Sequence, residues 1–341
     1  MSLAETTDDE LSGRVDEAIS STDFSGVIRV DHDGERVLER AAGSADRRWS
    51  VPMTTSTLLS IASGTKGFTA LAVMALVEAG ALTLGTRARA LLGSDLPMID
   101  DGVTIEHLLG HRSGIGDYFD EDAMGDISDY AIPVPVHRLD SAEAYLAVLD
   151  GFPQVSAPGA EFAYNNGGYV VLALLAERAG GRSYHELVDD LVVRRANLAD
   201  TAFIRSDALP TGVATGYLDR DGLRTNALHL PLLGVGDGGL FSTAADLAAF
   251  WTALFDDRIV SGEHVEVMTR PRSDAPELRR RCGLGFWLAA TGPTVFLDGY
   301  DAGVSFRSMH DPTTRTTRTV IANTSEGAWD LLREVSELRE P

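Results

Sequence analysis

The 341-residue chain has little cysteine and no long apolar run, and each scarcity excludes a class of structure. Cys282 is the only cysteine, which excludes an intrachain disulfide. No apolar run approaches the roughly 20 residues of a membrane-spanning helix. Residues 1–17 are acidic and have no apolar core, so we expect no signal peptide and a cytoplasmic protein; a leader removed earlier would leave the same sequence.

Basic residues are also scarce. The chain has 29 Lys and Arg against 51 Asp and Glu, a net charge of −22. A surface of this sign repels nucleic acid and anionic membranes, so a small molecule is the expected partner. Apolar residues make up 44% of the chain, enough for a real core, and the length allows two domains.

Lys66 is the only lysine among the 29 basic residues. Arginine serves well in salt bridges but keeps its proton in a protein, whereas a buried lysine can lose it. A position that retains lysine is therefore a candidate general base. Ser63 lies three residues earlier, in a Ser-x-x-Lys arrangement that pairs a serine nucleophile with a lysine. Alone this pattern is weak, because an ordinary surface lysine beside a serine gives it too.

The residues after Ser63 predict a buried helix over 63–80. Phe68, Leu71 and Met74 lie at helical spacing on a broad apolar face, and Gly80 is suited to end the helix. Ser63 and Lys66 would then share one side of the first turn. Burial and the positive end of the helix dipole both favour the neutral amine, which can take the hydroxyl proton of Ser63.

The pattern along the chain predicts an α/β (α+β) protein with a mainly antiparallel sheet made from both termini. Residues 25–42 are typical of a β-hairpin, and strands are expected at 283–289, 294–298, 303–309 and 317–323. Residues 103–250 look mostly helical, with helices at 167–180 and 242–255, a capping box of Thr243 with Asp246, and a last helix over 326–338. The expected organisation is an α/β part in 1–90, an inserted helical domain in 91–255 and an α/β part in 256–341.

A second informative motif is Tyr164-Asn165-Asn166, between a Pro-Gly turn and an apolar helix. A lysine cation near a phenol favours its ionised form, so Tyr164 is a candidate proton relay. Asn166 offers a donor and an acceptor to a substrate carbonyl or amide. Either residue alone is usually a turn asparagine or a half-buried tyrosine, and only the pair of motifs favours a site.

With these motifs the chain resembles the serine β-lactamase and penicillin-binding protein superfamily. The resemblance covers roughly 24–325 and points to the class C-like branch, which includes carboxylesterases, D-aminopeptidases and amide hydrolases. It rests on the segments Leu59–Thr69, Val103–Ile115, Tyr164–Asn166, Gly238–Leu247 and Gly283–Trp287.

The third motif of the family departs from its pattern here. Relatives place Lys-Thr-Gly or His-x-Gly on a strand that lines the pocket, and the best match is Asp301-Ala302-Gly303, with Tyr300 before it. An aspartate would then replace the cation, so binding of a substrate carboxylate, as in β-lactams, is in doubt. Gly303 would still let a substrate approach the strand closely.

The resemblance implies acyl transfer to water through an acyl-enzyme. Ser63 would be the nucleophile, with Lys66 and Tyr164 as a coupled base and proton shuttle, and Tyr164 would later activate water. Backbone N–H groups of Ser63 and Val304 would form the oxyanion hole, and Asn166 would orient the acyl part. No metal or organic cofactor is required.

A carboxylesterase is the first expectation for the activity. An amidase or D-aminopeptidase comes next, and a weak β-lactamase after these. From a different class, a binding or sensing module remains open because one motif is degraded.

Other motifs favour no separate function. Residues 234–239 satisfy Gly-x-Gly-x-x-Gly without a preceding strand, so a loop beside the pocket is expected and not a dinucleotide site. His107 and His111 are spaced as on a helix, yet their surroundings disfavour zinc, and the chain has no Gly-x-Ser-x-Gly elbow. His111 and Ser113 are expected to shape a loop beside the site. Tyr118 and Phe119 either wall the pocket or lie in an exposed loop.

Overall fold

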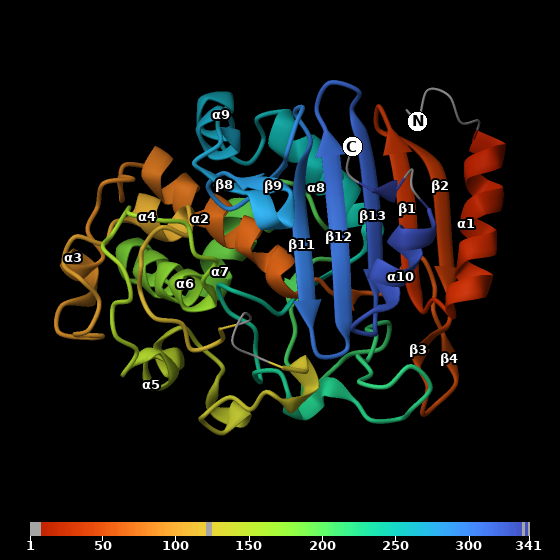
Figure 1. Ribbon diagram of the computed structural model, residues 1–341, viewed down its shortest axis with the longest axis horizontal. Helices are drawn as coiled ribbons and strands as arrows, with labels where there is room; N and C mark the ends of the chain where they lie inside the picture. Colours follow the sequence, from red (N-terminus) through yellow and green to blue (C-terminus); the bar gives the residue numbers. More distant parts are fainter. Residues whose placement is uncertain (1–7, 121–124, 336–337, 340–341) are drawn as a thin grey trace.

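The computed structural model describes residues 8–120, 125–335 and 338–339. An antiparallel sheet with the strand order β2-β1-β13-β12-β11-β10-β9-β8 lies at its centre (Figure 1). These strands are β1 Gly26–His32, β2 Glu35–Ala42, β8 Ser273–Ala275, β9 Arg280–Cys282, β10 Trp287–Ala289, β11 Val295–Asp301, β12 Val304–Asp311 and β13 Thr316–Ala322. Because β1 pairs with β13, both ends of the chain build one sheet, which confirms the predicted fold class.

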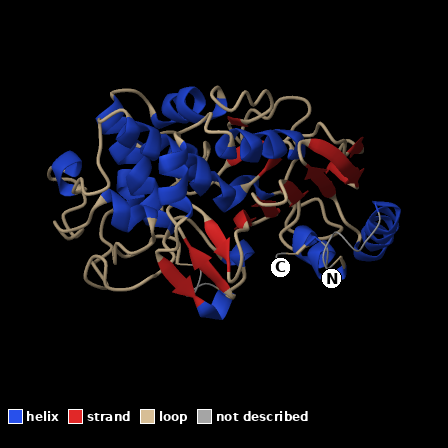
Figure 2. Cartoon of the chain, turned by 90° about the horizontal axis from the view of Figure 1, so that it is seen from above, coloured by secondary structure: helices blue, strands red, loops and turns tan. Residues whose placement is uncertain are grey.

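Helices cover both faces of this sheet. The longer ones are α1 Asp8–Thr22, α2 Thr65–Glu78, α6 Asn166–Gly180, α8 Ala244–Phe255, α9 Gly262–Thr269 and α10 Gly327–Glu334. One face of the sheet packs on α1 and α10 through a small core that includes Leu11, Ile28 and Leu331. The larger core lies on the other face and extends into the helical part, which Figures 1 and 2 show to one side of the sheet.

Short elements complete the helical part and its edges. The remaining helices are α3 Arg89–Leu92, α4 Ile105–Leu109, α5 Leu146–Leu149 and α7 Tyr184–Val188. Two small sheets add β3 Ser44–Asp46 with β4 Val51–Pro52, and β5 Leu59–Ser60 with β6 Ala202–Phe203 and β7 Leu240–Ser242. Among the helices of the described ranges, none is both long enough and apolar enough to cross a bilayer.

Several details differ from the sequence-based expectations. Residues 103–250 are less helical than predicted, because much of the chain between α4 and α6 runs as loops and single turns. The capping box is only half formed: Thr243 accepts from the N–H of Asp246, but the Asp246 carboxylate turns to Thr201 at 2.8 Å. The last helix ends at Glu334, and residues 336–337 of its predicted range lie outside the described part. The helix α1 was not predicted.

The nucleophile helix begins where the sheet meets the helical part. A single 3₁₀ turn, Ala62–Gly64, leads into α2, and this turn lies against β11. Apolar side chains surround α2 so completely that every residue from Thr65 to Leu76 is buried. The Ser-x-x-Lys motif is therefore held between the sheet and the helices, as the sequence predicts.

Candidate active site

Lys66 lies at the centre of the site, with its amine among three oxygen atoms. Its Nζ donates to Ser63 Oγ at 2.7 Å, to Asn166 Oδ1 at 2.8 Å and to the backbone carbonyl of Asp237 at 2.8 Å. The side chain is almost completely buried. Three different segments of the chain thus meet at the one lysine, and the amine is within proton-transfer distance of the serine hydroxyl.

Tyr164 is held face to face between two aromatic rings. Its ring stacks on His111 with centroids 4.5 Å apart and on Trp287 with centroids 5.8 Å apart. The Lys66 amine lies 5.0 Å from the centroid of the Tyr164 ring. The two motifs that the sequence singled out are therefore brought together, and the stacking fixes the plane in which the phenol can lie.

His111 supports this arrangement as a neutral ring. Its Nδ1 accepts a hydrogen bond from the N–H of Asn165 at 3.0 Å, so that nitrogen carries no proton. Burial, with the nearby Lys66 charge as the second cause, lowers the pKa of His111 to about 3. His111 therefore shapes the site as a structural residue, as the sequence predicts. His107 is used separately, as an acceptor for the N–H of Thr104 at 3.3 Å.

Asn166 is fixed by the start of α6. The helix is capped by Asn165, whose side chain accepts from the N–H of Gly168 at 2.6 Å. The carboxylate of Asp117 accepts from the N–H groups of Asn166 at 2.6 Å and Gly167 at 2.8 Å. Desolvation raises the pKa of Asp117 to about 6 even though these donors oppose the shift. This anchoring aims the Asn166 amide oxygen at Lys66.

Asp237 is a site residue that sequence reasoning missed. Besides its carbonyl contact with Lys66, its carboxylate accepts a 2.5 Å hydrogen bond from the phenol of Tyr118. Desolvation raises the pKa of the Asp237 carboxyl, while the Lys66 charge lowers it. The sequence placed Asp237 only in a glycine-containing loop beside the pocket; that location is correct, but nothing local marks its contact with the lysine.

Ser63 lies in the wall of two pockets. The inner pocket has a cavity of about 70 Å³ and includes Tyr118, Phe119, Asn166, Asp237 and Asp301 in its lining. The outer pocket has a cavity of about 680 Å³ and includes Phe162, Tyr164, Trp287, Tyr300 and Trp329. Tyr118 and Phe119 therefore wall the site, and Asp301 lines the inner pocket whereas Tyr164 lines the outer one.

The third motif lies differently from the sequence-based alignment. A Cβ on Gly299 would lie 2.1 Å from the carbonyl oxygen of Ile61, so Gly299 is the glycine that lets β11 touch the nucleophile turn. Gly303, with φ of +72°, belongs instead to the two-residue turn before β12, where a Cβ would meet the backbone N of Tyr217 at 2.8 Å. Gly303, the residue aligned with the family glycine, is thus four positions from Gly299, which approaches Ile61 next to the turn that carries Ser63.

The backbone N–H groups of Val304 and Tyr300 also lie differently from the expectation, and the register of the hairpin is again the reason. Val304 pairs with Asp301 across the hairpin, and residues that flank a two-residue turn form a hydrogen-bonded pair. The N–H of Val304 is therefore directed into the sheet. In the next pair, Tyr300 with Ser305, the N–H of Tyr300 points to the opposite edge of β11, away from β12. Ser63 and Tyr300 line the same pocket. Tyr300 also lines the outer pocket, as the sequence suggested for a substrate-binding residue.

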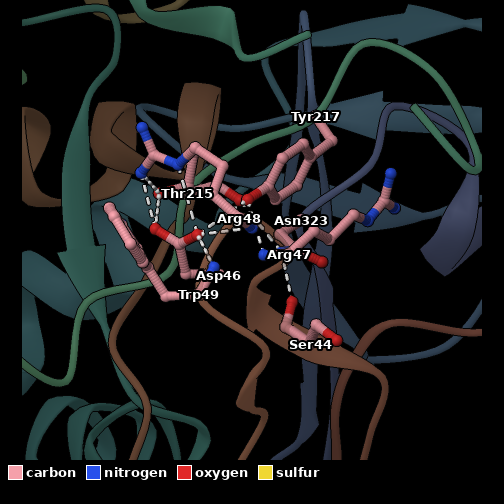
Figure 3. A network of polar contacts seen from close by, with 8 residues as sticks. All are labelled: Ser44, Asp46, Arg47, Arg48, Trp49, Thr215, Tyr217 and Asn323. Carbon is pink, nitrogen blue, oxygen red and sulfur yellow. Dashed lines mark hydrogen bonds and ion pairs between the residues drawn. The ribbon is translucent and has the colours of Figure 1, made fainter. Parts of the chain in front are cut away.

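A polar network joins the end of β3 to the segment 213–226 (Figure 3). Tyr217 donates its phenol O–H to Asp46 at 3.3 Å, which joins the segment 213–226 to the end of β3. In the same segment, Asn226 donates to the carbonyl of Ala302 at 2.9 Å. This second contact holds the hairpin end that carries Tyr300 and Asp301.

The class of this protein follows from its architecture and its site: a serine–lysine pair lies at the start of a buried helix, next to an antiparallel sheet. Residues 13–337 match the β-lactamase family, and the chain belongs to this family.

Two curated relatives and one solved structure illustrate the similarity. Esterase EstB of Burkholderia gladioli is 33% identical over 220 residues, which cover 60% of this chain and 53% of the esterase. Penicillin-binding protein 4* of Bacillus subtilis is 28% identical over 251 residues, or 70% and 54%. The chain thus spans about half the length of these two relatives. The crystal structure of a penicillin binding protein from Bacillus halodurans superposes with a TM-score of 0.88 at 32% identity, covering 95% of this chain and all (100%) of the other.

Proposed function

We propose that the protein is a serine hydrolase that cleaves carboxylic esters through an acyl-enzyme on Ser63. The observation that carries this proposal is the 2.7 Å contact between the Lys66 amine and the Ser63 hydroxyl in a buried setting. A lysine amine at this distance can take the hydroxyl proton in its neutral form and so activate the serine. The similarity to an esterase over part of the chain agrees with the proposal.

In the proposed first step, Lys66 takes the hydroxyl proton while Ser63 Oγ forms a bond to the ester carbonyl carbon. The negative oxygen that develops would be stabilised by the backbone N–H groups of Ser63 and of Tyr300, the latter in place of Val304. The loss of one such donor typically slows an enzyme by about a hundredfold or more. Asn166 holds Lys66 and orients the acyl part.

After this attack, the proton passes through Tyr164 to the alcohol oxygen, and the bond between that oxygen and the carbonyl carbon breaks. A water molecule then attacks the acyl carbon while Tyr164 takes its proton. The bond between the acyl carbon and Ser63 Oγ breaks, the carboxylic acid leaves, and the proton passes to Ser63 Oγ. The Lys66 amine lies 5.0 Å from the centroid of the Tyr164 ring, and the proposed mechanism treats the two as a coupled pair whose protons belong to both groups.

The second candidate is an amidase or D-aminopeptidase, because the same acyl-enzyme chemistry cleaves amides. A β-lactamase is less favoured because Asp301 lines the inner pocket beside Ser63, where it would repel the carboxylate of a β-lactam. Parallel assays with 4-nitrophenyl acetate, D-amino acid amides and a chromogenic cephalosporin rank the three activities.

A serine-directed fluorophosphonate tests the proposal against a binding or sensing module. We expect covalent labelling of the wild type and of Ser56→Ala, which changes an exposed serine. Ser63→Ala should not be labelled. A folded wild-type protein that neither reacts with the probe nor hydrolyses any of the substrates would establish the module instead.

A further inference from the structure

The two pockets at Ser63 differ about tenfold in size, with cavities of about 70 Å³ and about 680 Å³. An ester that reacts at Ser63 has two parts, the acyl group and the alcohol, and each must lie on one side of the serine. The unequal pockets therefore impose a size rule on the substrate, provided that each part can be assigned to a pocket.

The roles proposed for Tyr164 and Asn166 assign the alcohol and the acyl group to the two pockets. Tyr164, which in the proposed mechanism gives a proton to the departing alcohol, lines the outer pocket and is absent from the lining of the inner one. Asn166, which orients the acyl part, lines the inner pocket. The alcohol thus belongs in the outer pocket and the acyl group in the inner pocket.

The inner pocket limits the acyl group in size and charge. A water-sized group needs about 10–15 Å³ of such cavity volume, so the inner pocket holds roughly five to seven non-hydrogen atoms. Its lining includes the acidic residues Asp237 and Asp301. An acyl chain that carries its own carboxylate would meet like charge there, which favours short, uncharged acyl groups.

The outer pocket suits a large aromatic alcohol. Five aromatic side chains line it: Phe162, Tyr164, Trp287, Tyr300 and Trp329. Acidic residues Asp274 and Glu277 are also part of the lining. Aromatic rings bind other rings and cations, and the acidic groups repel anions, so a neutral or cationic aromatic alcohol is the matching leaving group.

We propose that the enzyme prefers esters of a short, uncharged acyl group with a bulky aromatic alcohol, and that Phe241 and Leu230 set the upper limit of acyl length. This inference rests on the proposed hydrolase function. Phe241, on β7, and Leu230 line both the inner pocket and an adjoining cavity of about 240 Å³. Their side chains separate the two spaces, so a smaller residue would lengthen the acyl pocket.

A pair of isomeric esters tests the assignment of the pockets. In 2-naphthylmethyl acetate the ring is in the alcohol, and in methyl 2-naphthylacetate the same ring is in the acyl group. We expect kcat/KM, divided by the rate of alkaline hydrolysis of each ester, to favour the acetate by at least about tenfold, or roughly 1.4 kcal/mol. Trp329→Ala should reduce this ratio, because it removes part of the outer wall.

A series of 4-nitrophenyl esters, from acetyl to dodecanoyl, tests whether Leu230 and Phe241 limit the length of the acyl group. Wild-type kcat/KM should fall beyond about six acyl carbons, and Leu230→Ala and Phe241→Ala should move this fall to longer chains. Leu228→Ala is the matched control, because Leu228 lies two residues away and is 83% exposed. Since Phe241 is buried and its variant can unfold, the partly exposed Leu230 keeps the test independent of folding.

The outcomes separate this inference from the proposed function. Hydrolysis of both isomers with an equal or reversed preference, or chain-length profiles that Leu230→Ala leaves unchanged, would overturn the inference and leave the serine hydrolase intact. Absence of hydrolysis of every ester, together with no fluorophosphonate labelling of Ser63, would overturn both.

Discussion

The phenol of Tyr118 donates a 2.5 Å hydrogen bond to the carboxylate of Asp237, the residue whose carbonyl also holds the Lys66 amine. Burial raises the pKa of Tyr118 well above 10.0, so its phenol keeps its proton and is the donor in this hydrogen bond. A contact between these two side chains therefore joins the wall of the inner pocket to the residue that holds Lys66.

Tyr118→Phe should lower the free energy of unfolding by about 1–3 kcal/mol, because it leaves the Asp237 carboxyl without this donor. A double-mutant cycle with Asp237→Asn, measured by urea denaturation, gives the coupling between the two side chains. We expect a coupling above about 0.5 kcal/mol. Strict additivity of the two single changes would show that the contact contributes nothing.

Lys66→Arg should be nearly as damaging as Lys66→Ala. The proposed mechanism needs a proton that can be removed, and arginine supplies the charge without that proton. We expect kcat to fall by about a hundredfold or more in both variants. Substantial esterase activity of a correctly folded arginine variant would mean that Lys66 acts only through its charge.

His111 predicts a pH dependence of stability. Its folded pKa of about 3 lies below the ordinary 6.5, so the unfolded chain takes up the proton first as the pH falls. The stabilisation is complete above about pH 6.5 and is lost as the pH falls towards 3. His111→Asn removes this titration, and asparagine tolerates the backbone φ of 53° at this position.

Melting temperatures at pH 7.0, 6.0 and 5.0 provide the measurement. The wild type should lose more stability over this range than His111→Asn, although the variant starts lower because the ring stacked on Tyr164 is gone. Parallel curves for the two proteins would refute a titrating role for His111.

Asp301 should disfavour anionic acyl groups. Like charges at close range and moderate effective dielectric repel by a few kcal/mol, or roughly tenfold to several hundredfold in rate. Asp301→Asn should therefore raise kcat/KM for a hemisuccinate ester relative to its methyl-capped analogue. If Asp301 acts only structurally, the variant will melt lower while the ratio between the two substrates stays the same.

The parts of the site that local rules govern were predictable from the sequence. Ser63 and Lys66 meet because a helix places residues three apart on one side, and the apolar run after them ensures burial. Tyr164 and Asn166 follow from the short motif before α6. The strands of 295–322 were recognisable by their alternation and turns. The helix α1 was missed because most of its residues are polar, although Leu11, Val15 and Ala18 form the stripe that packs in the small core.

Long-range packing decided what the sequence did not reveal. Tyr118 and Asp237 are separated by 119 positions, and no local pattern indicates that their side chains meet. The third motif offered two glycines, and only the hairpin register shows that Gly299 touches Ile61 while Gly303 makes the turn. Because a shift of a few residues along a strand changes which backbone N–H groups are left outside the sheet, the proposal of Tyr300 as oxyanion donor depends on the hairpin register.

The only lysine of the chain is also the buried one that contacts Ser63. Selective isotope labelling of lysine therefore places a single observable side chain in the whole protein, at the proton-transfer centre. Its NMR signal can be followed through a titration without assignment, before and after Ser63 is acylated. The protonation state on which the chemistry depends is thus open to direct spectroscopy in the intact wild-type enzyme.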